Sequence, residues 1–491
     1  MCIRDRSRDD QAYLLAVARD TWDWFALHVG TASHHLPPDN VQTVPRTMVA
    51  ERTSPTNIGL YLLSLACARA FGWVTPSEMA TRLQATLDTL DRLPRERGHF
   101  LNWIDTQTLQ TLLPAYVSTV DSGNLCGHLL VVAQACETAG GSAAEQALLK
   151  TLAIRCRRFA EAADFTFLYD PRRRLLHIGW RVAEQTLDDG HYDLLASESR
   201  LASLWAIAKG DVPAAHWAAL GRPFVATPRE VGLRSWSGSM FEYLMPALVL
   251  DEPAGSALGA ASHMAVQEQR DYARQHHLPW GVSESAYAAA DRSLAYQYAP
   301  QGVPRLALRR TPPDERVVAP YASALAAMLE PKAATDNLRA LQALRARSRW
   351  GFIEALDYTA SRQMDAGGGE AASTDEYTLV STFMAHHQGM TLVSLANVLL
   401  QGLPRRWAMA DARLAAVAPL LQERVPREVA RLQEPDPGSQ RREAPESAAH
   451  TPRDVQPGAH ALQRTQLLGN GRYSVALRLS LIHISEPTRP Y

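Results

Sequence analysis

Two short stretches of the sequence each place one glutamate among small residues and beside aromatic side chains. Glu198 lies in residues 192–203, and Glu284 lies in residues 280–287. Both are expected at or near the start of a helix. Reaction at a glycosidic bond needs one carboxylic acid to protonate the leaving oxygen and a second carboxylate to act as nucleophile or to activate water. The sequence therefore offers Glu198 and Glu284 as a catalytic pair for sugar-bond chemistry.

Each glutamate also has a structural interpretation. Glu198 could pair with Arg200 or with the dipole of the helix that follows, and Glu284 could cap a capping-box-like turn. Burial would raise the pKa of Glu198, whereas helix-terminal amides would lower it. The carboxyl separation, about 5 to 5.5 Å for retention and about 6.5 to 9.5 Å for inversion, does not follow from the sequence.

Other residues are candidates for binding sugar, although each could instead be structural. Carboxylates accept hydrogen bonds from sugar hydroxyls, aromatic rings stack on the apolar faces of sugar rings, and imidazole or amide groups bind hydroxyls. The candidates are the carboxylates Asp121, Asp193, Glu242, Glu354 and Asp357, the aromatic residues Trp236, Trp280, Tyr287, Tyr296, Tyr298 and Tyr321, and the polar residues His386, His387 and Gln388.

No metal or cofactor is predicted. His386 and His387 are adjacent, and neighbouring side chains on a helix point about 100° apart, so the pair cannot share one ion. Cys126 and His128 lie close in sequence, but no second pair completes a metal site. The sequence contains no GxSxG, no phosphate loop and no GxGxxG, and Gly367 to Gly369 are expected in a loop.

Charge and composition favour a neutral ligand. The 491 residues include 50 Lys+Arg and 51 Asp+Glu, so the net charge is -1 and no block of like charge stands out. This balance argues against nucleic-acid binding. The four cysteines besides Cys2 include no CxxC pair, which favours a reduced compartment. No stretch reaches the roughly 18 uninterrupted apolar residues typical of a membrane span.

Apolar residues recur at helical spacing through most of the chain, which predicts about twelve helices in consecutive pairs. We expect an all-α fold, an (α/α)6 toroid in which six inner helices surround a pit, with a few short hairpins. A helical-repeat solenoid is the alternative, but the sequence has no fixed repeat of that kind. The predicted helices span residues 10–29, 57–71, 75–93, 121–138, 143–163, from 194 onward, 235–248, 256–275, 320–329, 331–347 and 378–400.

The two ends of the chain differ from its middle. The first six residues and residues 479–484 can be encoded by reverse-complementary DNA, so we expect residues 1–6 and 479–491 to be translated sequencing-adapter DNA around a gene fragment. The predicted catalytic domain covers residues 7–424. Residues 425–459, rich in Pro, Glu, Arg, Ser and Ala, are expected to form a disordered linker. A Gly-Asn-Gly turn between β-prone runs predicts the start of a truncated β domain at 460–478.

Several motifs in a fixed order closely resemble the middle region of bacterial cyclic β-1,2-glucan synthases, over about residues 18 to 429. They are RTSPTNIGLYLLS at 52–64, YVSTVDSGNL at 116–125, residues 192–210, SWSGSMFEYLMP at 235–246, PWGVSESAY at 279–287, VAPYASAL at 318–325 and MAHHQGM at 384–390. The sequence departs from the family pattern at Ser199, at Ala288 and in a glycine-rich loop at 365–376, but it keeps both glutamates.

The resemblance implies a glucoamylase-like (α/α)6 domain within a very large inner-membrane protein. In that family this region lies between a glycosyltransferase and a phosphorylase-like region, and residues 466–477 look like the first strand of the latter. The resemblance implies that this domain, on the cytoplasmic face of the membrane, closes linear β-1,2-glucan into rings by retaining transglycosylation. Carried over by position, Glu198 would be the nucleophile or its equivalent, and Glu284 the general acid/base.

Two other functions remain open at this point. A hydrolytic β-1,2-glucanase could use the same toroid and the same carboxylates, and a non-catalytic module could simply hold the glucan. The residues alone do not separate these alternatives.

Overall fold

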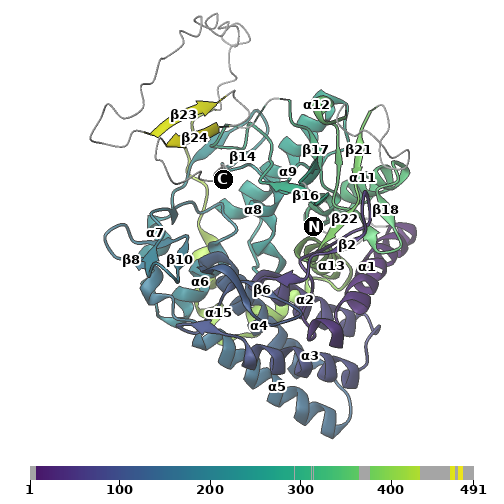
Figure 1. Cartoon of the computed structure of the whole chain (residues 1–491), viewed down its shortest axis with the longest axis vertical. Helices are drawn as coiled ribbons and strands as arrows, with labels where there is room; N and C mark the ends of the chain where they lie inside the picture. The colour runs from purple at the N-terminus through teal and green to yellow at the C-terminus, as the bar shows by residue number, and fades with distance from the viewer. Residues whose placement is uncertain are drawn as a thin grey trace, which may run out of the picture. The chain divides into compact units, whose positions relative to one another are not determined.

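The computed structural model describes residues 7–291, 293–310, 312, 314–363, 376–431, 465–469 and 474–478. The chain divides into two compact units, Met1–Leu432 and Gln433–Tyr491, whose elements are labelled in Figure 1. Several predicted segments lie outside the described residues. They are the ends at 1–6 and 479–491 that we expect to be adapter sequence, residues 432–459 of the predicted linker, and residues 365–375 of the glycine-rich loop.

Helices dominate the first unit, as predicted, and several begin where the sequence places a cap. Ser54 Oγ accepts a hydrogen bond from the amide of Asn57 (3.2 Å), and Thr75 Oγ1 accepts one from the amide of Glu78 (3.1 Å). In both cases a proline follows the cap and opens the helix. The helices are α1 Arg8–His28, α2 Pro55–Ala70, α3 Pro76–Arg92, α4 Thr119–Thr138, α5 Ala143–Ala162, α6 Arg200–Lys209, α7 Ala215–Ala219, α8 Met240–Leu244, α9 Ala257–His276, α10 Pro320–Ala326, α11 Pro331–Ala343, α12 Ala360–Gln363, α13 Ala385–Leu399, α14 Leu403–Ala410 and α15 Ala412–Val417.

Six of these helices contact one another in a cyclic order. Helix α2 contacts α4, α4 contacts α6, α8 contacts α10, α10 contacts α13, and α13 contacts α2. Arg200, the first residue of α6, joins α6 to α8, because its guanidinium donates to the carbonyls of Glu242 (2.7 Å) and Tyr243 (2.6 Å). Helices α1, α5, α9 and α11 pack against α13, α4, α8 and α10, respectively. This pairing of inner and outer helices agrees with a helical toroid.

One junction in this order depends on a glycine. A Cβ added at Gly123 of α4 would lie 2.1 Å from the Cβ of Ala202 in α6. A side chain at this position would therefore force the two helices apart and shift the start of α6.

Short strands connect the helices and are more numerous than the few hairpins predicted. A five-stranded sheet has the order β11-β10-β7-β6-β3, and three sheets have three strands, in the orders β2-β1-β22, β12-β9-β8 and β17-β20-β21. The strands of these four sheets are β1 Asn40–Gln42, β2 Met48–Val49, β3 Arg52–Thr53, β6 Asn102–Asp105, β7 Thr111–Ser118, β8 Tyr169–Asp170, β9 Leu175–His177, β10 Gly179–Arg181, β11 Thr186–Leu187, β12 His191–Tyr192, β17 Val317–Val318, β20 Ala355–Asp357, β21 Thr378–Val380 and β22 Thr382–Met384. The two-stranded pairs are β4 Arg95–Glu96 with β5 His99–Phe100, β13 Phe224–Ala226 with β14 Val231–Leu233, β15 Ser285–Ala290 with β16 Tyr296–Ala299, and β18 Arg347–Ser348 with β19 Gly351–Phe352.

Three helix predictions were wrong in ways that concern the site. The helix expected from residue 194 begins only at Arg200, so Glu198 lies in the turn before it. Glu284 precedes strand β15 rather than a helix, which removes its interpretation as a helix cap. The single helix expected over 378–400 is two buried strands followed by α13. A short buried apolar run fits either a strand or a helix, so periodicity could not separate them.

The second unit has one described hairpin, β23 Thr465–Gly469 paired with β24 Ser474–Arg478. This pair coincides with the β-prone runs in the sequence. Across the described residues of both units, none of the helices combines the length and apolar character needed to cross a membrane.

Candidate active site

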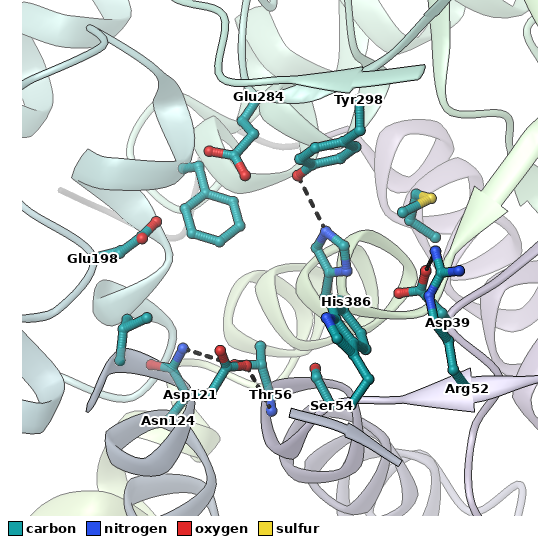
Figure 2. Close-up of a pocket in the computed structure, with 14 residues that line it drawn as sticks. Asp39, Arg52, Ser54, Thr56, Asp121, Asn124, Glu198, Glu284, Tyr298 and His386 are labelled. Atoms are coloured by element: carbon teal, nitrogen blue, oxygen red, sulfur yellow. Dashed lines mark hydrogen bonds and ion pairs between the residues drawn. The ribbon is translucent and has the colours of Figure 1, made fainter. Parts of the chain in front are cut away.

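The starts of several ring helices face one cavity of about 300 Å³. Ser54 and Thr56 lie at the start of α2, Asp121 and Asn124 in the first turns of α4, and His386 at the start of α13. Figure 2 shows Glu198 and Glu284 directed into this cavity, with Tyr298 beside Glu284. The complete lining is Asp39, Arg52, Ser54, Thr56, Trp103, Val120, Asp121, Asn124, Glu198, Phe241, Glu284, Tyr298, Met384 and His386.

Glu198 is not held by Arg200. The Arg200 guanidinium donates to the Glu252 carboxylate from Nε (2.7 Å) and from Nη2 (3.2 Å), and this pair is almost fully buried. Within the described part of the chain, Glu198 has no ion-pair partner. Burial raises the pKa of Glu198 well above its usual value, and the nearby carboxyl groups of Glu284, Glu242 and Asp121 raise it further. Both effects favour the protonated form of Glu198.

A different set of neighbours determines the pKa of Glu284. Burial again raises the pKa of its carboxyl, but a hydrogen bond from the Tyr298 hydroxyl and the charge of Arg309 lower it, so that it is about 7. At neutral pH, Glu284 is thus the more easily ionised of the two cavity glutamates.

A buried network fixes the backbone around Glu284. The Tyr321 hydroxyl lies 2.7 Å from the carbonyl of Glu284 and 2.8 Å from Ser283 Oγ. The Tyr321 ring stacks on His387, with centroids 3.7 Å apart. His387 Nδ1 lies 2.9 Å from Glu354 Oε1, and the same oxygen accepts a hydrogen bond from the amide of Ala286 (3.1 Å). These contacts position Glu284 from outside the cavity lining. The residues that make them are Tyr321, His387 and Glu354.

A second chain of contacts reaches Tyr298 through His386. Asn57 Nδ2 donates to Asp39 Oδ1 (3.2 Å), which leaves Asn57 Oδ1 to accept from His386 Nδ1 (3.2 Å). Burial lowers the pKa of His386 to about 3, so the ring is neutral and its Nε2 is an acceptor. The Tyr298 hydroxyl lies 3.3 Å from this nitrogen. Its single proton can therefore go to His386 or to Glu284.

Asp121 joins α2 and α4 at the floor of the cavity. Its carboxylate accepts hydrogen bonds from the amide of Thr56 (3.3 Å) and from Asn102 Nδ2 (3.0 Å). Of the predicted site residues, Asp121, Glu198, Glu284, Tyr298 and His386 meet in this cavity.

The remaining predicted residues lie outside the cavity lining. Trp236 is 48% exposed and donates through Nε1 to Asp193 (2.8 Å), so this hydrogen bond is open to solvent. Trp280 and Gln388 are buried in the core, where Gln388 Nε2 donates to the Phe352 carbonyl (3.1 Å). The rest are Tyr287, which lies under the Arg362 guanidinium, Tyr296, which bonds the Leu379 carbonyl, and Asp357, which accepts from Ala288, Thr359 and Arg362.

Glu242 is also occupied by protein groups. Its carboxylate accepts hydrogen bonds from the hydroxyls of Ser235 (2.9 Å) and Ser239 (3.0 Å) and from the amide of Ser237 (3.2 Å). These contacts fold residues 235–239 around the carboxylate. Glu242 thus holds the segment that carries Trp236.

Sequence reasoning missed several residues of the cavity lining. These include Asp39, Arg52, Thr56, Trp103, Asn124, Phe241 and Met384. Arg52, Thr56, Asn124, Phe241 and Met384 do lie in the motifs that carry the family resemblance. Asp39 and Trp103 lie outside those motifs, in short segments with no chemical pattern of their own.

Comparisons with known proteins show what this chain is similar to. Residues 190–410, which contain both glutamates, match a family model described as "Putative glucoamylase". The cyclic beta-(1,2)-glucan synthase NdvB of Rhizobium meliloti is 36% identical to this chain over 94% of the chain and 20% of that protein. The chain is similar to part of a cyclic β-1,2-glucan synthase. The predicted resemblance is thus confirmed, and the chain spans about a fifth of that relative's length.

Solved structures share the fold of the first unit. An endo-β-1,2-glucanase from Chitinophaga pinensis superposes with a TM-score of 0.66 at 15% identity, covering 85% of this chain and 99% of that one. An endo-β-1,2-glucanase from Talaromyces funiculosus gives 0.66 at 13% identity, covering 89% of this chain and 95% of that one. At these identities the likeness concerns the fold.

Proposed function

We propose that this chain acts on β-1,2-glucan and closes linear chains into rings by retaining intramolecular transglycosylation. The observation that carries the proposal is the pair of enclosed carboxyl groups, Glu198 and Glu284, which face one cavity with different proton affinities. The similarity to a cyclic β-1,2-glucan synthase supports the proposed substrate class and ring-closing outcome.

The electrostatics favour the reverse of the roles expected from position in the sequence. The pKa of Glu198 is raised well above its usual value by burial and by three neighbouring carboxyl groups, which suits a general acid. Burial also raises the pKa of Glu284, to about 7, and the Tyr298 hydroxyl can stabilise its ionised form. We therefore assign Glu198 as general acid/base and Glu284 as nucleophile.

In the first step, Glu198 gives its proton to the glycosidic oxygen while Glu284 attacks the anomeric carbon. The bond to the leaving sugar breaks, and a covalent glucosyl-enzyme forms. In the second step, Glu198, now ionised, takes the proton of a hydroxyl at the far end of the same glucan chain. That oxygen displaces Glu284, which closes the ring and restores both carboxyl groups.

Ring closure requires that the distal hydroxyl reach the intermediate before water does. Trp103, Phe241, Tyr298 and Met384 give the cavity a partly apolar wall. Such a wall can hold the looped chain and exclude water, so that the attacking hydroxyl has a high effective concentration. No cofactor is needed for this chemistry.

A linear β-1,2-glucan substrate tests the proposal directly. In mass spectrometry we expect cyclic products that are lighter by one water than linear chains with the same number of glucose units, together with the shorter leaving chains. Shorter linear products would instead establish an endo-acting hydrolase, which is the second candidate because endo-β-1,2-glucanases share the fold. Glu198→Gln and Glu284→Gln should each abolish turnover while glucan binding persists. Unchanged turnover in both variants would refute the site, and binding without turnover by the unmodified chain would indicate a glucan-binding module.

We also propose the domain arrangement implied by the resemblance. Residues 7–424 would form an (α/α)6 catalytic domain whose inner wall is α2, α4, α6, α8, α10 and α13. Residues 425–459 would be a linker, and residues 460–478 would begin a phosphorylase-like region. In the full-length protein, this domain would lie on the cytoplasmic side of the inner membrane beside a glycosyltransferase.

A further inference from the structure

Asp170, His177 and His191 lie on three neighbouring strands of one small sheet. His177 on β9 is paired with His191 on β12, and Asp170 on β8 is paired with Leu175 on β9. Leu175 and His177 are two residues apart, and directly paired residues share a face, so all three side chains lie on the same face of the sheet. With one ligand atom taken from each, the three atoms all lie within 4.8 Å of one another.

Asp170 and His177 each have one atom bonded to the backbone and one ligand atom left over. Asp170 Oδ1 accepts hydrogen bonds from the amides of Arg172 (2.8 Å) and Arg173 (3.1 Å), which leaves Oδ2. His177 Nδ1 lies 2.6 Å from the Asp188 carbonyl and must donate to it, so the lone pair of His177 is on Nε2. This bond also fixes the ring, as the second hydrogen bond of a metal-bound histidine commonly does.

The third side chain, that of His191, lies beside Asp170. The His191 side chain is only 7% exposed, and its Nε2 makes no well-oriented hydrogen bond to a described residue but lies within ion-pair range of the Asp170 carboxylate. That atom lies 3.4 Å from Asp170 Oδ2. Ligand atoms at about 2.0 to 2.1 Å around a tetrahedral Zn²⁺ are separated by roughly 3.3 Å. The spacing of this pair therefore already matches one edge of such a site.

An ion pair between a protonated His191 and Asp170 would give the same 3.4 Å contact, and the zinc titration described below separates the two explanations. The backbone amide of Arg173 holds Asp170 Oδ1 in place, whereas the charge of the Arg173 side chain opposes a bound cation.

We propose that Asp170, His177 and His191 bind one Zn²⁺ ion, at a site separate from the glutamate cavity. Two imidazoles and one carboxylate are ligands that zinc accepts, and imidazole favours it over Mg²⁺ or Ca²⁺. The ion would tie β12 to β8 and β9. Because Tyr192 and Asp193 follow His191 directly, the ion would also anchor the start of the segment that leads to Glu198.

The test uses the whole chain without a polyhistidine tag, stripped of metal by a chelator. Zn²⁺ is titrated calorimetrically, and Co²⁺ is titrated with visible absorption as the readout of coordination geometry. We expect one equivalent of either ion and a rise in melting temperature with Zn²⁺. Asp170→Asn, His177→Gln and His191→Gln should each weaken binding by at least about 100-fold, more than the loss of an outer hydrogen bond usually costs.

His263→Gln is the matched control, because His263 is a partly exposed histidine on α9 with no part in the cluster. It should bind zinc as the unmodified chain does. If one of the three ligand variants fails to fold, the other two decide. The proposal is overturned if the unmodified chain binds no equivalent of zinc, or if binding persists in the ligand variants, as it would for an ion held by His386 or His387.

Discussion

Removing the Tyr298 hydroxyl should move the pH dependence of the reaction in a direction set by the role of Glu284. The hydroxyl lowers the pKa of the Glu284 carboxyl, which is about 7. A hydrogen bond to a charged group is worth about 1.5 to 3 kcal/mol, and about 1.4 kcal/mol corresponds to one pH unit. In Tyr298→Phe we therefore expect the pKa of Glu284 to rise by roughly one to two pH units.

The assay is the pH profile of kcat/KM on linear β-1,2-glucan, which reports ionisations of the free enzyme. If Glu284 is the nucleophile, the acid limb near pH 7 moves upward, and kcat/KM at pH 6 falls by roughly 10-fold to 100-fold. The deficit should shrink as the pH rises above the new limb. Because the two glutamates interact, the fitted values belong to the pair.

The same variant separates the two assignments of the glutamates. If Glu284 were the general acid, a higher pKa would extend the alkaline limb and leave kcat/KM at pH 6 nearly unchanged. Tyr296→Phe is the control, since Tyr296 lies on the same strand and its hydroxyl contacts the Leu379 carbonyl (3.4 Å) outside the cavity lining. An acid limb that stays in place in Tyr298→Phe would refute the reasoning.

Three further predictions concern stability. Glu284 has a raised pKa, about 7 against 4.5, so its protonated form favours folding below pH 4.5 and that stability is lost as the pH rises through 7. In unfolding titrations between pH 4.5 and pH 8, the free energy of unfolding of Glu284→Gln should therefore rise by about 3 kcal/mol relative to that of the unmodified chain. Arg200→Leu leaves Glu252 buried without its partner, and chemical denaturation should show a loss of about 3 to 5 kcal/mol. Glu242→Ala removes the acceptor around which three serines fold, so calorimetry should show a lower melting temperature and a loss of about 2 to 4 kcal/mol.

Matched surface variants provide the controls. Arg19 pairs with Asp23 on the solvent-facing side of α1, and both side chains are nearly half exposed, so Arg19→Leu should cost less than about 1 kcal/mol. Glu51 is exposed, and Glu51→Ala should leave the melting temperature unchanged. Equal losses in Arg200→Leu and Arg19→Leu would contradict a stabilising role of the buried Arg200 guanidinium. If the difference in the free energy of unfolding between the unmodified chain and Glu284→Gln stays constant with pH, the raised pKa of Glu284 is contradicted.

Local sequence signals predicted the helices well because their caps are local. Ser54 and Thr75 bond amides three residues ahead, and the prolines that follow them suit only the first turn of a helix. Strand β15 could not be predicted in the same way. Its residues pair with β16 across a loop, and in isolation Ser285 to Ala290 carry no alternating pattern. The position of Glu284 before a strand was therefore hidden.

Which residues line the cavity depends on how the helices of the toroid pack together, and no short motif encodes that packing. Residue types picked out five cavity residues, including both glutamates, because carboxyl groups among aromatic residues suggest sugar chemistry. The same reasoning also picked out Glu354 and His387, which do belong together but bond each other (2.9 Å) behind Glu284. Whether a polar side chain faces the substrate or supports a neighbour is decided by packing between distant helices.

The sequence left open whether burial or helix-terminal amides dominate the pKa of Glu198. The bonds that Arg200 makes to other groups help to decide this. A carboxylate at the start of a helix is usually stabilised by the amides and the helix dipole, which lower its pKa. Here Arg200, the nearest cation in sequence, is taken by Glu252 and by the carbonyls of Ser197, Glu242 and Tyr243. Burial and the repulsion of neighbouring carboxyl groups then dominate, and they raise the pKa of Glu198. The contacts that join α6 to α8 thus also favour the protonated form of the proposed general acid.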